Sequence, residues 1–446
     1  MNSPNNGPDS GPNNGAYNAA TTLQKVRGGL ARRYRAERRF RAAGLASILA
    51  GLAFVVLLFG AILSAGAGAF TQTSFTLDVH LDENAFAGRG ASPQALQDAL
   101  DQADYRGLLN RSLYALFPDA RSRRDKKALR ALVSSGAAFD LRAQVAADPS
   151  VIGTTVRFRA LADDEADLFY KGKVDRTLAE DRRRLNDRQI ARLDRLAADG
   201  RVERHFNRTL FTRGDSREPE RAGLLGALTG SFFALLVAFL LSFPIGIATA
   251  VYLEEFAPRN RLTDFIEVNI NNLAAVPSII FGLLGLAVFL NFFGLPRSSS
   301  LVGGIVLALM TLPTIIIAGR AALKAVPPSI REAALAMGAS PMQTALHHTL
   351  PLAMPGVLTG TVIGMAQALG ESAPLLMIGM VAFIVDVPQN FTDPATALPV
   401  QVYLWANQAE RAFTELAAAA TLVLLLFLIA MNLGAVLLRK KFERRW

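Results

Sequence analysis

The chain has 446 residues, of which 51% are hydrophobic and 19% charged, and its mean hydropathy is +0.28. This composition is typical of a membrane protein. The net charge of +10 is compatible with nucleic-acid binding, but the basic residues cluster beside apolar runs, which favours a role in orienting the chain in a bilayer. The absence of cysteine excludes disulfides, thiol catalysis and thiolate metal sites.

The composition of residues 1–41 predicts a disordered tail followed by a basic cytosolic segment. Residues 2–16 are rich in Asn, Pro and Gly and have little to bury, and six arginines lie between Arg32 and Arg41. The apolar run over residues 42–70 is long enough to span a bilayer and longer than the core of a typical signal peptide. It predicts a first transmembrane helix that is not cleaved.

Residues 71–222 differ in character from the rest of the chain. They carry 27 Lys and Arg against 24 Asp and Glu and contain no apolar run that could span a membrane. The pattern predicts a water-soluble α+β insert with a strand, an alternating stretch and two helices, over residues 74–80, 151–158, 93–116 and 174–198. Basic stretches at 121–127 and 182–184 are interleaved with acids, as on solvated helix faces, and are assigned no site.

Residues 223–446 are predicted to be a five-helix core. Its apolar segments bring the number of spans to six and lie over residues 224–253, 271–293, 301–319, 352–383 and 412–438. Basic clusters at both ends of the chain predict cytoplasmic termini, so residues 71–222 face the periplasm and the loops at 254–264 and 320–351 face the cytoplasm. Four spans contain proline, and Gly356, Gly360 and Gly364 recur at a spacing of four, which favours an irregular, tightly packed bundle.

The loop over residues 320–351 contains its own helix signals. Ser329 with Glu332 three residues later predicts a capping box, and Gly338 predicts the end of that helix. Ser340 followed by Pro341 and Gln343 predicts a second helix start. Helix, break and helix make a short plug that a partner's groove can accept.

These residues carry a resemblance to a known element. The loop is similar to the EAA loop of ABC-transporter permeases, the element that plugs into the ATPase subunit. The similarity rests on Glu332, Ala333, Ala334, Gly338, Leu350 and Pro351. One departure is His348, which stands where the family usually has Ile or Val. The resemblance implies that these six residues couple the chain to an ATPase.

An acidic residue lies in the predicted fifth span. Glu371, with Gln367 one turn earlier, is costly in an apolar environment, so we take both as candidates for the translocation pathway, and Asn271 and Asn272 in the third span as further candidates. The alternative is that Glu371 is protonated and serves packing alone. Residues 269–289, 309–327, 364–376 and 396–406 extend the resemblance to the phosphate-specific permease of bacterial phosphate import, the PstA type.

The resemblance covers about residues 215–446 and has two departures. Gln367 stands where many members have Arg, and Arg320 and Ala321 stand where many have a pair of Glu. The implied fold is an all-α polytopic bundle of six transmembrane helices, like a type I ABC importer permease, with the α+β insert between the first two spans. The implied function is translocation of inorganic phosphate across the bacterial cytoplasmic membrane.

The implied partners are a second similar permease, two ATP-binding-cassette ATPase subunits and a periplasmic phosphate-binding protein. No cofactor is expected in the chain itself, because its Gly172-Lys173 pair lacks the surroundings of a P-loop, so ATP and Mg²⁺ belong to the ATPase and the chain is not an enzyme. Two alternatives stay open. The cargo could be molybdate, sulfate or another oxyanion, or the chain could be a membrane-anchored sensor.

Overall fold

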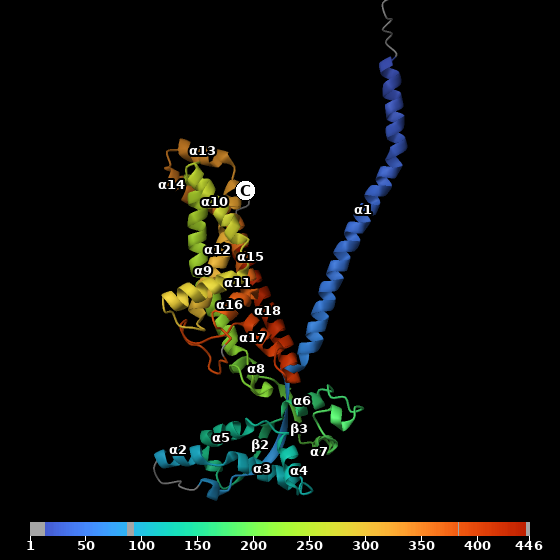
Figure 1. The fold of residues 1–446 in the computed structure, drawn as a ribbon, viewed down its shortest axis with the longest axis vertical. Helices are drawn as coiled ribbons and strands as arrows, with labels where there is room; N and C mark the ends of the chain where they lie inside the picture. The colour runs from blue at the N-terminus through green and yellow to red at the C-terminus, as the bar shows by residue number, and fades with distance from the viewer. Residues whose placement is uncertain (1–13, 87–92, 382, 443–446) are drawn as a thin grey trace, which may run out of the picture. The chain divides into compact units, whose positions relative to one another are not determined.

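The computed structural model describes residues 14–86, 93–381 and 383–442. The chain divides into two compact units, residues 1–61 and 62–446. The first is helical throughout its described part and belongs to α1 (Asn14–Gly66), whereas the second holds the insert and the helical core (Figure 1). The predicted boundary of the insert at residue 222 stays a prediction, because the insert and the core belong to the same unit.

Helix α1 is longer than the predicted span. The predicted disordered tail lies outside the described residues up to residue 13, but residues 14–16 and the whole basic segment are helical. Ala, Leu, Arg, Glu and Lys, which are strong helix formers, dominate that segment and explain its helicity. The stretch Arg32–Phe70 is long and apolar enough to cross a membrane.

The insert is built on a three-stranded antiparallel sheet in the order β2-β1-β3. The predicted strand over 74–80 is confirmed as the central strand β1 (Thr71–His80), and the alternating stretch corresponds to β2 (Thr155–Leu161), while β3 (Val202–Phe206) had no predicted counterpart. Strand β1 buries Phe75, Leu77 and Val79, and these side chains form the hydrophobic core with the surrounding helices. The prediction of an α+β insert is therefore confirmed.

The helices of the insert are shorter than predicted. They are α2 (Pro93–Gln102), α3 (Tyr105–Leu116), α4 (Arg123–Arg130), α5 (Ala137–Ala147), α6 (Asp164–Tyr170) and α7 (Asp187–Ala198). The helix predicted over 93–116 is broken because Asp104 caps α3, accepting a hydrogen bond from the Gly107 amide at 2.8 Å. The helix predicted over 174–198 begins only at residue 187, where Asn186 and Gln189 form a capping box.

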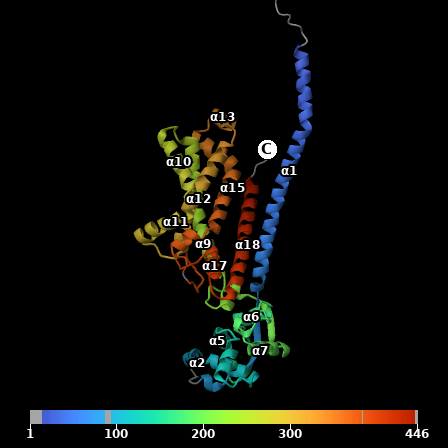
Figure 2. The same ribbon diagram turned by 45° about the vertical axis from the view of Figure 1, so that its right-hand side comes forward.

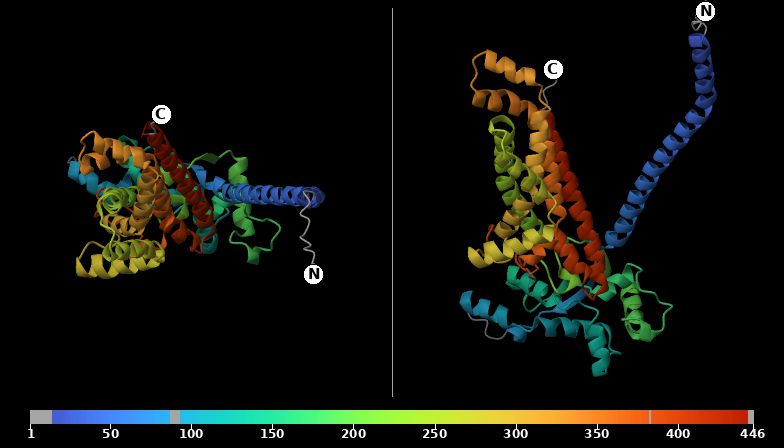
Figure 3. Two further views of the ribbon diagram at one scale, coloured as in Figure 1. Left: turned by 90° about the horizontal axis from the view of Figure 1, so that it is seen from above. Right: turned by 45° about the horizontal axis from the view of Figure 1, so that its top comes forward.

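Four long helices form the core: α9 (Leu225–Val251), α12 (Ser300–Lys324), α15 (Leu350–Gly370) and α18 (Arg411–Phe442). Figure 2 shows them running along one another, with the insert at one end of the bundle and α13 (Pro328–Ala336) at the other. Figure 3 shows the same arrangement from two further directions. The loop predicted to be a plug is thus separated from the insert by the length of the bundle.

Small residues bring these helices close together. A Cβ atom on Gly360 would lie 2.1 Å from the Ala318 side chain, and one on Gly356 would lie 2.7 Å from Ala322, so both glycines allow α15 to pack directly on α12. Gly304 of α12 does the same against α9, where an added Cβ would meet Val237 at 2.5 Å. The predicted packing face is confirmed at Gly356 and Gly360, whereas a Cβ atom on Gly364 would lie 3.7 Å from its nearest neighbours, an ordinary contact.

The predicted third and fifth spans differ from the structure. Among the described residues, five helices are long and apolar enough to cross a membrane, and the sixth candidate is a pair, α10 (Arg261–Ala274) and the helical stretch Ser278–Phe292, bent by 103°. The third span is therefore not one helix over 271–293, because Pro277 takes an extended backbone at the bend. The fifth span runs over Pro341–Gly370 rather than 352–383, and the short helices α16 (Ala373–Met377) and α17 (Leu398–Ala406) follow it.

Candidate functional site

The first helix of the loop, α13, begins two residues earlier than its sequence signal suggests. Its N-cap is Pro327 and no side chain caps it, so the predicted capping box of Ser329 and Glu332 is wrong. Proline disfavours helical geometry in the residue before it, so Pro327 stays extended (ψ 136°) and Pro328 becomes the first helical residue. Ser329 then lies inside the helix, where it cannot act as an N-cap.

The break after α13 follows the prediction. Gly338 has a φ of +87°, a left-handed conformation that favours glycine, and the Ala339 amide donates to the Ala334 carbonyl at 3.1 Å. Ser340 and Gln343 form the predicted capping box, with Pro341 in the first turn of α14 (Pro341–Gln343). The second helix is not short, however, because it continues through the π-helical stretch η8 (Thr344–Thr349) into α15.

The two sides of the loop differ in polarity and burial. Ala334 is buried, as are Thr344 and Ala345 of η8, the element on which α13 packs. The opposite side exposes four large apolar side chains, with Met337 88% exposed, at positions Leu335, Met337, Met342 and Leu346. An apolar tip that its own chain leaves uncovered has the character of a docking surface.

The six residues predicted to couple the chain to an ATPase lie in and beside this tip. Glu332 and Ala333 are exposed on α13, and Gly338 is exposed at the break. Leu350 and Pro351 are half-buried in the first turn of α15. Of the predicted pair of small residues, only Ala333 is therefore accessible to a partner, because Ala334 packs inward.

An arginine attaches the loop to the core. The Arg331 guanidinium donates to Glu255 from Nη2 at 2.7 Å and from Nε at 3.1 Å. It also donates to the main-chain carbonyls of Val326 and Leu323, both at 2.9 Å, at the C-terminal end of α12. The Leu323 carbonyl also accepts from the Val326 amide at 3.2 Å, so the arginine adds a second donor there while it binds a carboxylate of η6 (Tyr252–Phe256).

A second set of ion pairs lies beside the first. Arg320 of α12 contacts Glu267 of α10 at 2.6 Å and Glu254 of η6 at 3.6 Å, and Lys324 contacts Glu254 at 3.7 Å. The Arg320 side chain is 14% exposed. Coulomb attraction is therefore screened less here than at a free surface. Ion pairs thus join η6, which continues α9, to α10, α12 and α13 at the end of the bundle that carries the loop.

The sequence predictions did not identify this network. Its residues are spread over about 80 positions, and nothing in local periodicity pairs them. One signal was present, because Arg320 replaces an acidic residue usual in the resembling family and two adjacent acids, Glu254 and Glu255, end the second span. A basic residue at a position that is usually acidic indicates that an acidic partner lies elsewhere in the chain.

The structure places Gln367 and Glu371 at the end of α15. Gln367 is exposed, and Glu371 is half-buried directly after the last helical residue, where its amide donates to the Ala368 carbonyl at 3.3 Å. Glu371 therefore does not lie within a continuous helix, as the prediction of one span over 352–383 implied. It lies at the break between α15 and α16, where the backbone changes direction.

The other two pathway candidates belong to α10. Asn271 and Asn272 are exposed on α10, and no hydrogen bond within the described part of the chain joins either of them to Glu371. What meets the break is α11 (Ser278–Leu284), where a Cβ atom on Gly282 would lie 2.7 Å from the Pro374 Cα. Gln367 and Glu371 are one turn apart at the end of α15, and the assignment of these four residues to a translocation pathway stays a prediction.

Comparison with known proteins identifies the class. Residues 242–446 match the family described as the inner membrane component of binding-protein-dependent transport systems, and residues 27–180 match a domain of unknown function, DUF3333. The second match overlaps much of α1 and the insert. The part of the chain with an assigned family is therefore the helical core that carries the loop and the Glu371 break.

Several relatives are about equally similar. A probable ABC transporter permease protein of Bacillus subtilis, YqgI, is 30% identical over 226 residues, covering 48% of this chain and 76% of the relative. The phosphate transport system permease protein PstA 1 of Mycobacterium tuberculosis is 30% identical, covering 52% and 76%. PstA of Haemophilus influenzae is 31% identical, covering 50% and 78%. A structure of the methionine ABC transporter MetNI in an inward-facing conformation matches with 20% identity and a TM-score of 0.40, covering 48% of this chain and 95% of that one.

The chain belongs to this family of transport-system inner membrane components, as an ABC-transporter permease of the PstA type. It is a multi-pass protein of the inner membrane.

Proposed function

We propose that the chain is the permease subunit of an ATP-driven importer and carries inorganic phosphate across the cytoplasmic membrane. The observation that carries the proposal is the similarity of its core to relatives named phosphate transport system permease proteins, each covered over three quarters or more of its length. The uncovered apolar tip of the loop supports the same role, because a permease of this kind needs a surface for a motor subunit.

The proposed partners are a second similar permease, two ATPase subunits and a periplasmic phosphate-binding protein. In this assembly the groove of an ATPase receives Leu335, Met337, Met342 and Leu346, while Glu332 and Ala333 line the side of the contact. ATP binding and hydrolysis take place in the ATPase. Movement of α13 reaches the bundle through the pair of Arg331 and Glu255 and rocks the helices between outward and inward access.

The orientation of the chain is part of the proposal. Both termini lie in the cytoplasm with the loop, and the insert lies in the periplasm, at the other end of the bundle (Figure 2). Exposed positions test this directly: cysteine at Ala147 in the insert should react with an impermeant thiol reagent added outside intact spheroplasts, and cysteine at Ser329 should react only after the membrane is opened. The opposite labelling would overturn the orientation.

Uptake in cells tests the cargo. A strain that lacks this chain should lose high-affinity uptake of labelled phosphate and regain it when the chain is restored. Labelled sulfate and molybdate serve as matched oxyanion controls and should enter equally in both strains. Loss of sulfate or molybdate uptake with phosphate uptake unchanged would assign a different cargo.

A further inference from the structure

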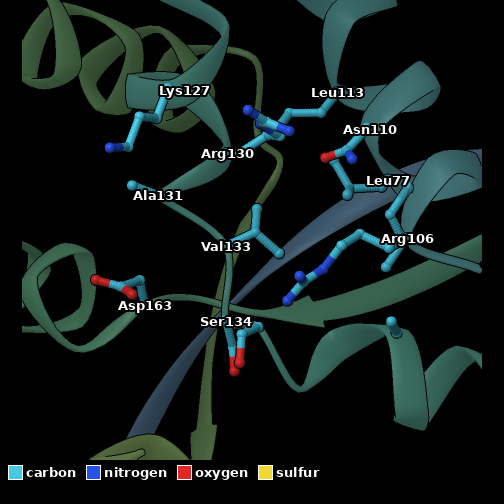
Figure 4. A pocket seen from close by; sticks show the side chains of 13 residues that line it. Leu77, Arg106, Asn110, Leu113, Lys127, Arg130, Ala131, Val133, Ser134 and Asp163 are labelled. Atoms are coloured by element: carbon cyan, nitrogen blue, oxygen red, sulfur yellow. The ribbon is translucent and has the colours of Figure 1, made fainter. Parts of the chain in front are cut away.

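A cavity in the insert has a lining that the transport function does not explain. It has a volume of about 280 Å³ and lies between β1, α3, α4 and the segment that leads into α5. Figure 4 shows Arg106 from α3 and Arg130 from α4 on either side of Val133, with Lys127 also in the lining. Two helices therefore bring three cationic side chains to one cavity.

These cations are exposed, and they have no partner in the part of the chain that the structure describes. No ion pair, side-chain hydrogen bond or aromatic contact engages Arg106, Lys127 or Arg130 among residues 14–86, 93–381 and 383–442. The carboxylates that are near in sequence are used elsewhere, since Asp104 caps α3, Asp119 pairs with Arg192 at 3.3 Å, and Asp125 pairs with Arg188 at 2.6 Å. The positive charge at the cavity is therefore left uncompensated.

The remaining lining is amide, hydroxyl and hydrocarbon, with one carboxyl group. The Asn110 side chain is half-buried, and Leu109, Leu113 and Val133 form an apolar wall. Burial, assisted by a hydrogen bond with Asp164, raises the pKa of Asp163 to about 8, so this carboxyl is largely neutral at pH 7. In the view of Figure 4 it also points away from Arg106 and Arg130.

Guanidinium groups bind phosphate oxygens with paired hydrogen bonds, and a phosphate monoester carries nearly two negative charges at neutral pH. The positive charge of three unpaired cations is balanced better by a phosphate monoester than by a single carboxylate. We propose that this cavity binds a small molecule that carries a phosphate group, with Arg106, Lys127 and Arg130 around the phosphate and the apolar wall beside any organic part.

The floor of the cavity is connected to the membrane core. The Ser135 hydroxyl donates to Glu218, and the Gln72 side chain of β1 donates to the Glu220 carbonyl at 2.6 Å. Glu218 and Glu220 belong to the segment just before α9. Ser135 lines the cavity and also contacts the segment that enters the core, so a bound ligand would be linked to that segment through a single residue. This arrangement suits a site that regulates transport rather than one that passes cargo.

Titration of the purified full-length protein in detergent tests the site. Inorganic phosphate and glycerol 3-phosphate are the two probes, with sodium acetate at equal ionic strength as the control for general charge effects. We expect either phosphate compound, but not acetate, to slow amide hydrogen exchange in α3, α4 and residues 131–136. Tighter binding of glycerol 3-phosphate than of inorganic phosphate would identify an organic ligand, and the reverse would identify the free ion.

The double variant Arg106→Gln/Arg130→Gln should weaken this binding at least about tenfold, because two charged hydrogen-bond donors are lost. The matched control is Arg123→Gln/Arg124→Gln, which removes the same charge from exposed positions of α4 that do not line the cavity, and it should change the affinity less than about twofold by screened charge alone. No protection of α3 and α4 by either probe would overturn the proposal. Equal weakening in the two double variants would also overturn it.

Discussion

Arg331 and Glu255 form a forked ion pair, with Nη2 and Nε of the arginine at 2.7 and 3.1 Å from the carboxylate. The pair joins α13, which carries the exposed apolar tip, to the end of the second span. The hydrogen bonds that Arg331 donates to Glu255 hold the pKa of its guanidinium above the ordinary value, so the arginine stays charged. We infer that this pair is the mechanical link between the loop and the bundle.

Breaking that link should impair coupling more than insertion. Arg331→Gln and Glu255→Gln should each lower phosphate uptake per inserted molecule severalfold, because each removes a partly buried charged pair that contributes on the order of 1–3 kcal/mol. The control variant Arg259→Gln removes an exposed charge from the 254–264 loop, which also contains Glu255, and should leave uptake unchanged. Uptake in the double variant should be no lower than in either single variant. Additive losses would show that the two residues act separately.

The break at Gly338 gives a second prediction. A side chain at a φ of +87° is strained by about 1–2 kcal/mol, so Gly338→Ala should shift the angle of α13 and reduce uptake while the protein still inserts. Gly434→Ala, in α18 with open space around it and no positive φ, is the control and should behave like the wild type. If Gly338→Ala transports normally, the bend is not needed for coupling.

Several of these features could be predicted from sequence because they depend on neighbouring residues. The capping box of Ser340 and Gln343, the helix break at Gly338 and the packing face of Gly356 and Gly360 are all found as expected. Ser329 failed as a cap because the conformation imposed on Pro327 by Pro328 fixed the helix start two residues earlier.

Other features depend on tertiary contacts, which periodicity does not contain. The 103° bend at Pro277 divides the predicted third span into two arms and leaves Asn271 and Asn272 exposed on one of them, which composition alone could not show. Likewise, the basic stretch over 121–127 appears as a solvated face in sequence, and only the fold brings Lys127 beside Arg106. The pairing of Arg331 with Glu255 belongs to the same class.

Glu371 gives a third prediction, which rests on its place at the break after α15. A charged carboxylate would repel a phosphate anion, whereas a neutral one can donate a hydrogen bond to it or to a neighbouring helix. Glu371→Gln, which keeps the size and a donor, should therefore retain most of the uptake, and Glu371→Ala and Glu371→Lys should lose most of it.

Uptake has to be normalised to inserted protein in this experiment. If Glu371→Ala lowers only the amount of folded protein, the residue serves packing. If Glu371→Gln is as inactive as Glu371→Lys, the neutral-donor role is wrong, and a charged Glu371 paired with a basic residue of the second permease becomes the better account.

The stability of the insert should depend on pH through Glu220. Burial raises the pKa of this carboxyl to about 7, although a hydrogen bond with Ser134 lowers it in part. An unfolded glutamate releases its proton near pH 4.3, so between about pH 4 and 7 the native state binds more protons than the unfolded state. The stability contributed by this group is therefore present at low pH and is lost as the pH rises through that window.

Glu220→Gln keeps the neutral shape and removes the titration. Its stability relative to the wild type should therefore rise between pH 5 and pH 8, by an amount on the order of 3 kcal/mol. Hydrogen exchange of the β1 amides measures it, since Gln72 of β1 donates to the Glu220 carbonyl at 2.6 Å. Glu180→Gln, at an exposed position, should show no such pH dependence relative to the wild type. A constant difference between Glu220→Gln and wild type at all pH values would contradict the assignment.

Transport in a reconstituted system tests the central claim most directly. The chain is purified with its co-expressed second permease and ATPase subunits and placed in proteoliposomes, with the binding protein on the side of the insert and ATP on the side of the loop. Labelled phosphate should then accumulate on the ATP side, only when ATP, Mg²⁺ and phosphate-loaded binding protein are all present. Accumulation of sulfate or molybdate in place of phosphate, or phosphate movement that is independent of ATP, would contradict the account.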